Sequence, residues 1–488
     1  MFMAVKDFFV RLRLAVKGFF VRLRSAAGSE ARKADINFRD ELKQFKIKMY
    51  LFLPELVLAF ISLIYFPKNY SLLSIPVYIA VFAVTLAAMI VLKGIVLIYA
   101  LDFTRDDLTL AFVAFFNAMI EIGIFFQLYI RTLTPNERIK LIELVILGVT
   151  TMVLLIVFRA ARVWRKIRKL KLIKKLIKNA HNNPDGFWLA VSGLLFVGIC
   201  VAIVVGKLGS LRLQIAMLEG SRLLLVLLVS ALAVLEDRVT KPFPKVILSL
   251  SFAAAGAVAC MFIAVTGEMG TILIVYLFTA FGLLQRGQYR LLAIQLFVLA
   301  AVVAFVAVFY GPGDHYYQRI FGLTSLPQVN QVRDELVNRT YLFPNPTRYA
   351  VRVDGALATR CEDFSFLNFL TVFGKIIGVV VLFAYAILLE KAAVRSDRMI
   401  SSRLDPEQVF ARRFSQYASL MLLSSCVIHA ASNTTALFFT GVNMPFVSDG
   451  LTTMVINVIF LLVISCTLSR RKETSYENVR KDTRVSVR

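Results

Sequence analysis

Histidine and cysteine are scarce in this sequence, and the few that occur form no recognisable site. The chain has 488 residues, of which three are histidine and five are cysteine. Only Cys361 lies in a long polar stretch, where it has no second cysteine to pair with, so no disulfide framework is expected. The histidines lack zinc-site spacing, and neither a phosphate-binding glycine loop nor a Ser-His-Asp pattern is evident. These absences argue against zinc enzymes, P-loop nucleotidases and serine hydrolases.

Acidic residues are also few. Asp and Glu number 31 against 56 Lys and Arg, which gives a formal net charge of +25. Such an excess is typical either of nucleic-acid binding or of membrane topology. The basic residues lie between apolar stretches and at both ends of the chain. Membrane topology therefore explains them, and no nucleic-acid partner is expected.

Long apolar stretches dominate what is present. Apolar residues make up 58% of the chain, against about 45–50% in soluble globular proteins. We therefore expect an all-α, polytopic membrane protein, and about twelve stretches have the length of a transmembrane helix. They lie near 49–66, 73–101, 108–130, 139–158, 186–206, 220–236, 246–265, 269–285, 289–310, 364–390, 413–438 and 447–468.

Lysine and arginine in the connecting segments indicate the orientation. The basic segments are the arm 1–48, the loop 159–185, the turn 285–290, the loop 391–413 and the tail 469–488. With twelve spans, all of these segments fall on one side, which is then the cytoplasm. Both termini are therefore expected in the cytoplasm, and the large loop 311–363 outside it.

Two near-identical segments, AVKDFFVRLR at 4–13 and AVKGFFVRLR at 15–24, lie in the arm 1–48. Their spacing is close to three helical turns, so the phenylalanines stay on one face. Phenylalanines together with basic residues are typical of a helix on an anionic membrane surface. Membrane lipids are therefore an expected partner of this arm, and a disordered basic tail is the alternative.

Three elements whose residues could take part in binding or catalysis fall on the extracytoplasmic side of this topology. They are TGEMGT at 266–271, CEDFSF at 361–366 and TGVNMPFVSDG at 440–450. The third interrupts two apolar spans with Gly and Pro, and such backbone cannot face lipid. Glu268 and Asp363 add a carboxylate to the first two, which is a functional candidate at a membrane boundary. The alternative is that both residues cap a following helix. Because both are expected on the same side of the membrane as the 440–450 segment, a functional role is favoured.

These elements resemble the motifs of the SEDS family (shape, elongation, division and sporulation), the RodA- and FtsW-type peptidoglycan glycosyltransferases. The family's Gln-Pro-Asp-Leu-Gly-Thr is matched at Glu268, Gly270 and Thr271, and its Thr-Asp-Phe-Ile-Phe at Asp363, Phe364 and Phe366. Its last signature is matched at Thr440, Gly441, Pro445, Phe446, Ser448 and Gly450. The order of the elements and the spans between them also agree. His429 stands where the family often has Asn.

The resemblance implies a ten-helix core at 108–468 preceded by two extra helices within 49–107. It implies an enzyme of the bacterial inner (cytoplasmic) membrane that polymerises lipid II, an undecaprenyl-linked precursor, into peptidoglycan for cell shape, elongation or division. A class B penicillin-binding protein, which is a transpeptidase, is the implied partner, and Asp363 is the implied catalytic base. The alternatives are an inert SEDS-like scaffold and a precursor carrier (flippase). A carrier would show broken helices in both halves, whereas only the 440–450 break is apparent.

The residues expected at the substrate are Glu268, Arg212, Arg360, Lys375, Thr440, Pro445 and Ser448. Positive side chains or a divalent cation would stabilise a leaving pyrophosphate, and the sequence does not decide between them. Thr440 and Ser448 can donate hydrogen bonds to phosphate or sugar, while Pro445 interrupts helical structure. Lys375 is expected inside a continuous span at 364–390, from which it could instead snorkel to the interface.

Overall fold

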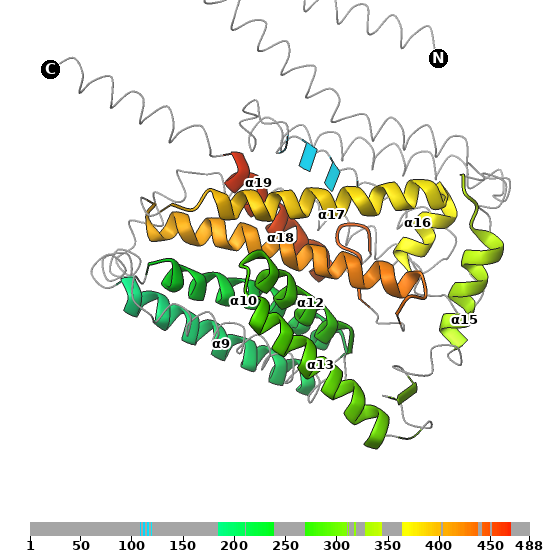
Figure 1. Ribbon diagram of the computed structural model, residues 1–488, viewed down its shortest axis with the longest axis horizontal. Coiled ribbons are helices and arrows are strands. Elements are labelled where there is room, and N and C mark those ends of the chain that lie inside the picture. The colour runs from blue at the N-terminus through cyan, green and yellow to red at the C-terminus, as the bar shows by residue number, and fades with distance from the viewer. Residues whose placement is uncertain are drawn as a thin grey trace, which may run out of the picture. The chain divides into compact units, whose positions relative to one another are not determined.

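The computed structural model describes residues 184–209, 211–238, 269–309, 327–343, 364–401, 404–437, 442–448 and 451–469, with single positions between 108 and 119 and at 311, 317 and 318. All of them belong to one compact unit, Val57–Arg488. Every regular element in these ranges is helical (Figure 1). The predicted all-α class is therefore confirmed. The count of twelve spans and the division into arm, extra helices and core stay predictions, because much of 1–183 lies outside the described residues.

Several described helices are suited to a bilayer. Four are long and apolar enough to cross a membrane by length and composition: Asp185–Leu208, Met217–Asp237, Tyr289–Phe309 and Lys375–Arg398. A helix satisfies its own backbone hydrogen bonds, which is what a hydrocarbon environment demands. The chain is accordingly a membrane protein, and the side that each end faces remains the prediction made from the basic segments.

Helices α9 (Pro184–Leu208) and α10 (Leu211–Arg238) pack against each other as a hairpin. Proline opens α9, Asp185 lies in its first turn and Lys207 in its last. Proline's fixed φ suits the first helical position, and the two charges complement the helix dipole. The sequence therefore sets where this helix begins and ends.

Helices α12 (Met269–Gln285) and α13 (Tyr289–Phe309) are joined by a tight turn in which Gly287 has a φ of 66°. Polar side chains hold the two helices together. The amide nitrogen Nε2 of Gln295 donates to the carbonyl oxygen of Tyr276 at 2.8 Å, and the Tyr276 hydroxyl donates to the carbonyl oxygen of Gln295 at 3.1 Å. Interhelical hydrogen bonds of this kind are common where helices cannot rely on the hydrophobic effect to associate.

Helix α18 (Pro406–Asn433) lies among the other described helices. It contacts α10, α12, α16 (Ser365–Phe373), α17 (Lys375–Arg398) and α19 (Leu451–Ser469), and Figure 1 shows α17 running beside it. Its buried positions continue from Val409 to Asn433 on all faces. Buried Ser419 and Ser424 donate to the carbonyl oxygens four residues earlier, each at 2.8 Å, so these hydroxyls are satisfied within the helix.

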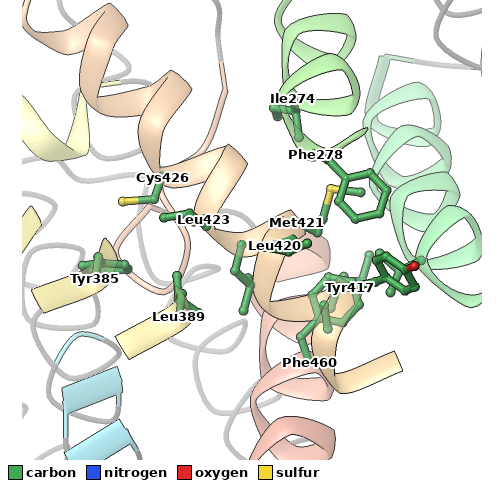
Figure 2. Packing of buried hydrophobic residues seen from close by; sticks show 14 of the residues in the cluster. Ile274, Phe278, Tyr385, Leu389, Tyr417, Leu420, Met421, Leu423, Cys426 and Phe460 are labelled. Atoms are coloured by element: carbon green, nitrogen blue, oxygen red, sulfur yellow. The ribbon is translucent and has the colours of Figure 1, made fainter. Parts of the chain in front are cut away.

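The apolar core is built around α18 (Figure 2). The ring of Tyr417 lies near that of Phe278 in an edge-to-face arrangement, with centroids 6.0 Å apart. The core also takes side chains from α12, α17 and α19, among them Ile274, Tyr385, Leu389 and Phe460. Close packing supplies most of the attraction between membrane helices, so this core holds α18 among its neighbours.

The span expected at 364–390 is not one helix. It divides into α16 and α17 at Gly374, which has φ 85° and ψ 163°. The N–H groups of Lys375 and Ile376, which open α17, donate to the carbonyl oxygens of Tyr341 and Leu342 at 2.9 and 3.2 Å. The expectation of a continuous helix was wrong because hydropathy does not change across Gly374, whereas the break depends on backbone from the large loop.

The described part of the large loop lies beside α16. It forms α15 (Pro327–Asp334) and a short π-helix, η1 (Glu335–Arg339). Val332 and Leu336 pack against Phe364 and Leu367 at the start of α16. The loop therefore helps to fix the position of the residues that follow Asp363 in the sequence.

Candidate functional site

The segment 442–448, between α18 and α19, is not helical and is buried. Its residues Val442, Met444, Phe446, Val447 and Ser448 are at most 3% exposed. The N–H of Met444 donates to the Ser448 hydroxyl at 2.6 Å, which closes the segment on itself. Backbone that cannot face lipid can fold into protein or line a wet cavity, and the described part of this segment is folded into protein.

Neighbouring aromatic rings hold the segment in a strained conformation. Phe446 has a φ of 68°, an unfavourable value for a bulky side chain that costs about 1–3 kcal/mol. Its ring is fully buried and lies 5.0 Å, centroid to centroid, from that of Phe116. The hydroxyl of Tyr385 donates to the carbonyl oxygen of Pro445 at 2.8 Å. Strain that surrounding contacts enforce is often found at functional sites.

Helix α16 begins against the same end of α18. Its N-cap position is Phe364, which makes no side-chain capping bond. The caps come from α18 instead: the N–H of Phe366 donates to Nε2 of His429 at 3.3 Å, and the N–H of Leu367 to Oδ1 of Asn433 at 3.1 Å. His429 and Asn433 are one turn apart and fully buried, so α18 presents both acceptors from one face.

A ring of hydrogen bonds joins α16, α18 and the segment 442–448. The Ser365 hydroxyl lies 2.6 Å from that of Ser448 and 3.1 Å from Nε2 of His429. Nδ1 of His429 is hydrogen-bonded to the carbonyl oxygen of Val442. Because the carbonyl can only accept, the ring proton lies on Nδ1, and Nε2 accepts from the N–H of Phe366. The arrangement thus brings together two of the three elements that the sequence singled out.

Three of the predicted site residues that are described lie in or next to this arrangement. Pro445 and Ser448 are buried in the 442–448 segment, and the Ser448 hydroxyl is engaged by protein partners. Lys375 is half-buried and opens α17, directly after the break, so it is not deep inside a helix as expected. Arg212 belongs to the first turn of α10.

The remaining predicted site residues lie outside the described residues: Glu268, Arg360, Asp363 and Thr440. Their roles therefore stay predictions. Asp363 immediately precedes Phe364, and Glu268 immediately precedes α12. No group of three or more His, Cys, Asp or Glu side chains able to hold a metal ion occurs within the described ranges.

A buried arginine that the sequence analysis did not select contacts the first of the three elements, 266–271. Arg222 of α10 donates from Nη2 to the Thr271 hydroxyl at 3.1 Å, and its Nη1 lies 2.8 Å from Oε1 of Glu219. Arg222 is 8% exposed. A charged residue within an apolar span is a signal that could have found it.

The opposite end of α18 holds a second polar cluster that sequence reasoning missed. Arg413 donates through Nε and Nη2 to both carboxylate oxygens of Asp237 at 2.7 and 2.6 Å, and through Nη1 to Asp397. Arg286, in the turn between α12 and α13, pairs with Glu236 and lies over the ring of Tyr417, 5.7 Å from its centroid. This cluster ties α10, α12, α17 and α18 together on the side that the topology assigns to the cytoplasm.

Comparisons with known proteins find limited similarity, among solved structures. No protein-family model matches the chain, and no curated protein matches it. Among solved structures, a chain from "Structural coordination of polymerization and crosslinking by a peptidoglycan synthase complex" aligns with a TM-score of 0.49 and 18% sequence identity, over 74% of this chain and 98% of that one. A similarity of this size says nothing about the activity of the present chain.

Proposed function

We propose that this chain is a membrane glycosyltransferase of the SEDS type that polymerises lipid II into peptidoglycan glycan strands, with Asp363 as the general base. It would act in the bacterial cytoplasmic membrane, with both termini in the cytoplasm and a class B penicillin-binding protein as its transpeptidase partner. The motifs in the sequence are the starting point. The contacts between the start of α16 and the segment 442–448 support it, because they unite two of those motifs.

One observation favours a catalytic role for Asp363 instead of a helix-capping role. The donors that an N-terminal cap would satisfy are the N–H groups of Phe366 and Leu367, and both already donate to His429 and Asn433. A helix whose first donors are bonded to a neighbouring helix does not need an acidic residue to satisfy them. This removes the main structural reason for a carboxylate at position 363 and favours a functional one.

The proposed reaction joins two lipid-linked sugars. The acceptor hydroxyl oxygen forms a bond to the anomeric carbon of the donor, whose bond to the diphosphate oxygen breaks with the electron pair leaving on the lipid diphosphate. The hydroxyl proton passes to the carboxylate of Asp363. In this scheme Arg212, Arg360 and Lys375 stabilise the charge on the diphosphate.

The other predicted substrate residues shape the donor site in this proposal. Glu268 and Thr440 would contact the donor. Pro445 and Ser448 act through the fold of the segment 442–448, since the Pro445 carbonyl accepts from Tyr385 and the Ser448 hydroxyl lies against Ser365.

A precursor carrier is the second candidate, because one observation favours it. The break at Gly374 adds a discontinuous helix beside the non-helical segment 442–448, and carriers place substrates at discontinuous helices. The sequence alone had shown only the second of these two interruptions. A carrier would move the lipid-linked precursor across the bilayer without forming a glycosidic bond.

The test is polymerisation of synthetic lipid II by the purified full-length chain, with and without a class B transpeptidase. Asp363→Asn keeps the ability to cap a helix but cannot accept the proton, so we expect normal expression with the rate reduced about 10²–10⁴-fold. Glu362→Gln is the matched control and should cost much less. Wild-type polymerisation by Asp363→Asn would refute the catalytic role. Lipid II transfer between leaflets without any glycan product would establish the carrier instead.

A further inference from the structure

We propose that His429 is a positioning residue of this site, whose single neutral tautomer sets the start of α16 relative to the segment 442–448. The proposal rests on the proposed glycosyltransferase function and deepens it. His429 does not touch substrate in this scheme, since its side chain is fully buried. It acts through the two segments that it holds, one of which follows Asp363 directly.

The tautomer is fixed because one hydrogen-bond partner of the imidazole can only donate and the other can only accept. The backbone N–H of Phe366 can only donate, so Nε2 of His429 must accept. The carbonyl of Val442 can only accept, so Nδ1 must carry the proton. One imidazole thus presents an acceptor to α16 and a donor to the segment 442–448, which no other protonation state can do.

Two serine hydroxyls complete a closed ring through the same imidazole. The Ser448 hydroxyl accepts from the N–H of Met444 at 2.6 Å and lies 2.6 Å from the Ser365 hydroxyl, which lies 3.1 Å from Nε2 of His429. Nδ1 of His429 then donates to Val442, at the other end of the same segment. Nε2 has one lone pair, which also accepts from the N–H of Phe366, so the Ser365 hydroxyl either shares that acceptor or donates to Ser448.

The ring links two pieces of chain that do not belong to one helix. The segment 442–448 has no helix to fix its register, and Phe364, the N-cap of α16, makes no side-chain capping hydrogen bond. Helix α18 bonds both through His429, and it sets the distance between them together with the hydrogen bond from Tyr385 to Pro445. Misplacement of a reacting group by about 1 Å can cost about 10²-fold in rate, so the ring would govern catalysis without taking part in it.

Two substitutions test the two contacts of the imidazole separately, because each keeps one contact and removes the other. The amide of His429→Asn overlaps the Nδ1 side of the ring, so it keeps a donor for Val442 and loses the acceptor for α16. The amide of His429→Gln reaches the Nε2 side, so it keeps the acceptor and loses the Val442 contact. Ser424→Ala is the control, because this buried hydroxyl of α18 bonds only within its own helix in the described structure.

Steady-state polymerisation of synthetic lipid II is measured per amount of folded protein. We expect His429→Asn to lower kcat about 10- to 100-fold with little change in KM, because it releases the helix that follows the base. His429→Gln should chiefly raise KM, because it releases the segment at the donor site. Ser424→Ala should change neither constant.

Two kinetic results would overturn the proposal. One is parental kcat and KM in both variants. The other is a loss of activity in both variants that is fully accounted for by a lower melting temperature, which would assign His429 a purely structural role.

A second measurement separates this proposal from the proposed function. Nitrogen-15 NMR of ring-labelled histidine, in a variant that lacks His181 and His315, reports which ring nitrogen carries the proton. A protonated Nδ1 and a bare Nε2 are expected. If lipid II is not polymerised by the parent chain, the proposed function fails and the positioning role fails with it. If polymerisation proceeds but Nε2 is protonated, only the positioning role is overturned.

Discussion

Gly374 is the residue whose replacement should test the break between α16 and α17 most directly. Its backbone, with φ 85° and ψ 163°, lies in a region used almost only by glycine, which costs other residues about 1–3 kcal/mol. A Cβ at this position would also lie 2.6 Å from the carbonyl oxygen of Leu342 and 2.8 Å from the carbonyl carbon of Phe343. These are backbone atoms, which cannot rotate away, so the loop must move.

Movement of the loop would break the hydrogen bonds that open α17. The N–H groups of Lys375 and Ile376 would lose the carbonyls of Tyr341 and Leu342, at about 0.5–1.5 kcal/mol each. Together with the backbone strain, Gly374→Ala should destabilise the protein by about 2–6 kcal/mol. The assay is the melting temperature of the detergent-solubilised protein, followed by size-exclusion chromatography.

A matched substitution supplies the control. Gly193 lies in α9, is exposed, and has open space where a Cβ would be added, so Gly193→Ala should be neutral or slightly stabilising. If Gly374→Ala were as stable as Gly193→Ala, the helix would run through this position and the described break would be wrong.

Two further predictions concern the other end of the bundle and its orientation. Arg413→Met should destabilise the protein by about 3 kcal/mol, the low end of the range for a broken buried ion pair, because its partners Asp237 and Asp397 have side chains 20% and 41% exposed. Adding Asp237→Asn should recover part of the loss in melting temperature, and no loss in the single variant would show that the cluster is not stabilising. A membrane-impermeant maleimide should label Cys361 from outside the cell and should not reach a cysteine introduced in 159–185; the opposite pattern would invert the topology.

Helix positions could be predicted from the sequence wherever the apolar pattern and the residues typical of helix ends agree. The spans expected at 186–206, 269–285 and 289–310 correspond to α9, α12 and α13. In α9 the proline, the acidic first turn and the basic last turn all mark its ends. The break at Gly374 could not be foreseen in this way, because the apolar pattern is continuous there and the carbonyls that stabilise the break belong to the large loop.

At the candidate site, one feature of the backbone was foreseen and its connections were missed. Gly and Pro in 440–450 predicted non-helical, protein-buried backbone, which holds for 442–448. The capping of α16 was not foreseen, since His429 and Asn433 lie 63 and 66 positions from the residues that they cap. Their one-turn spacing on a helix rich in serine was the available signal, but it does not name the partner.

The polarity of α18 explains why the site lies where it does. A helix that carries Arg413, Gln416, His429 and Asn433 cannot present them to lipid, because polar and charged groups are costly in hydrocarbon. Each of these side chains is at most 7% exposed and has a partner on another helix or, for His429, also on the 442–448 segment. The helix is therefore enclosed by its neighbours, with an ion-pair cluster at one end and acceptors at the other. Nε2 of His429 and Oδ1 of Asn433 accept from the start of α16, while Nδ1 of His429 donates to the segment 442–448, so non-helical backbone can persist at that end of α18 beside a helix start.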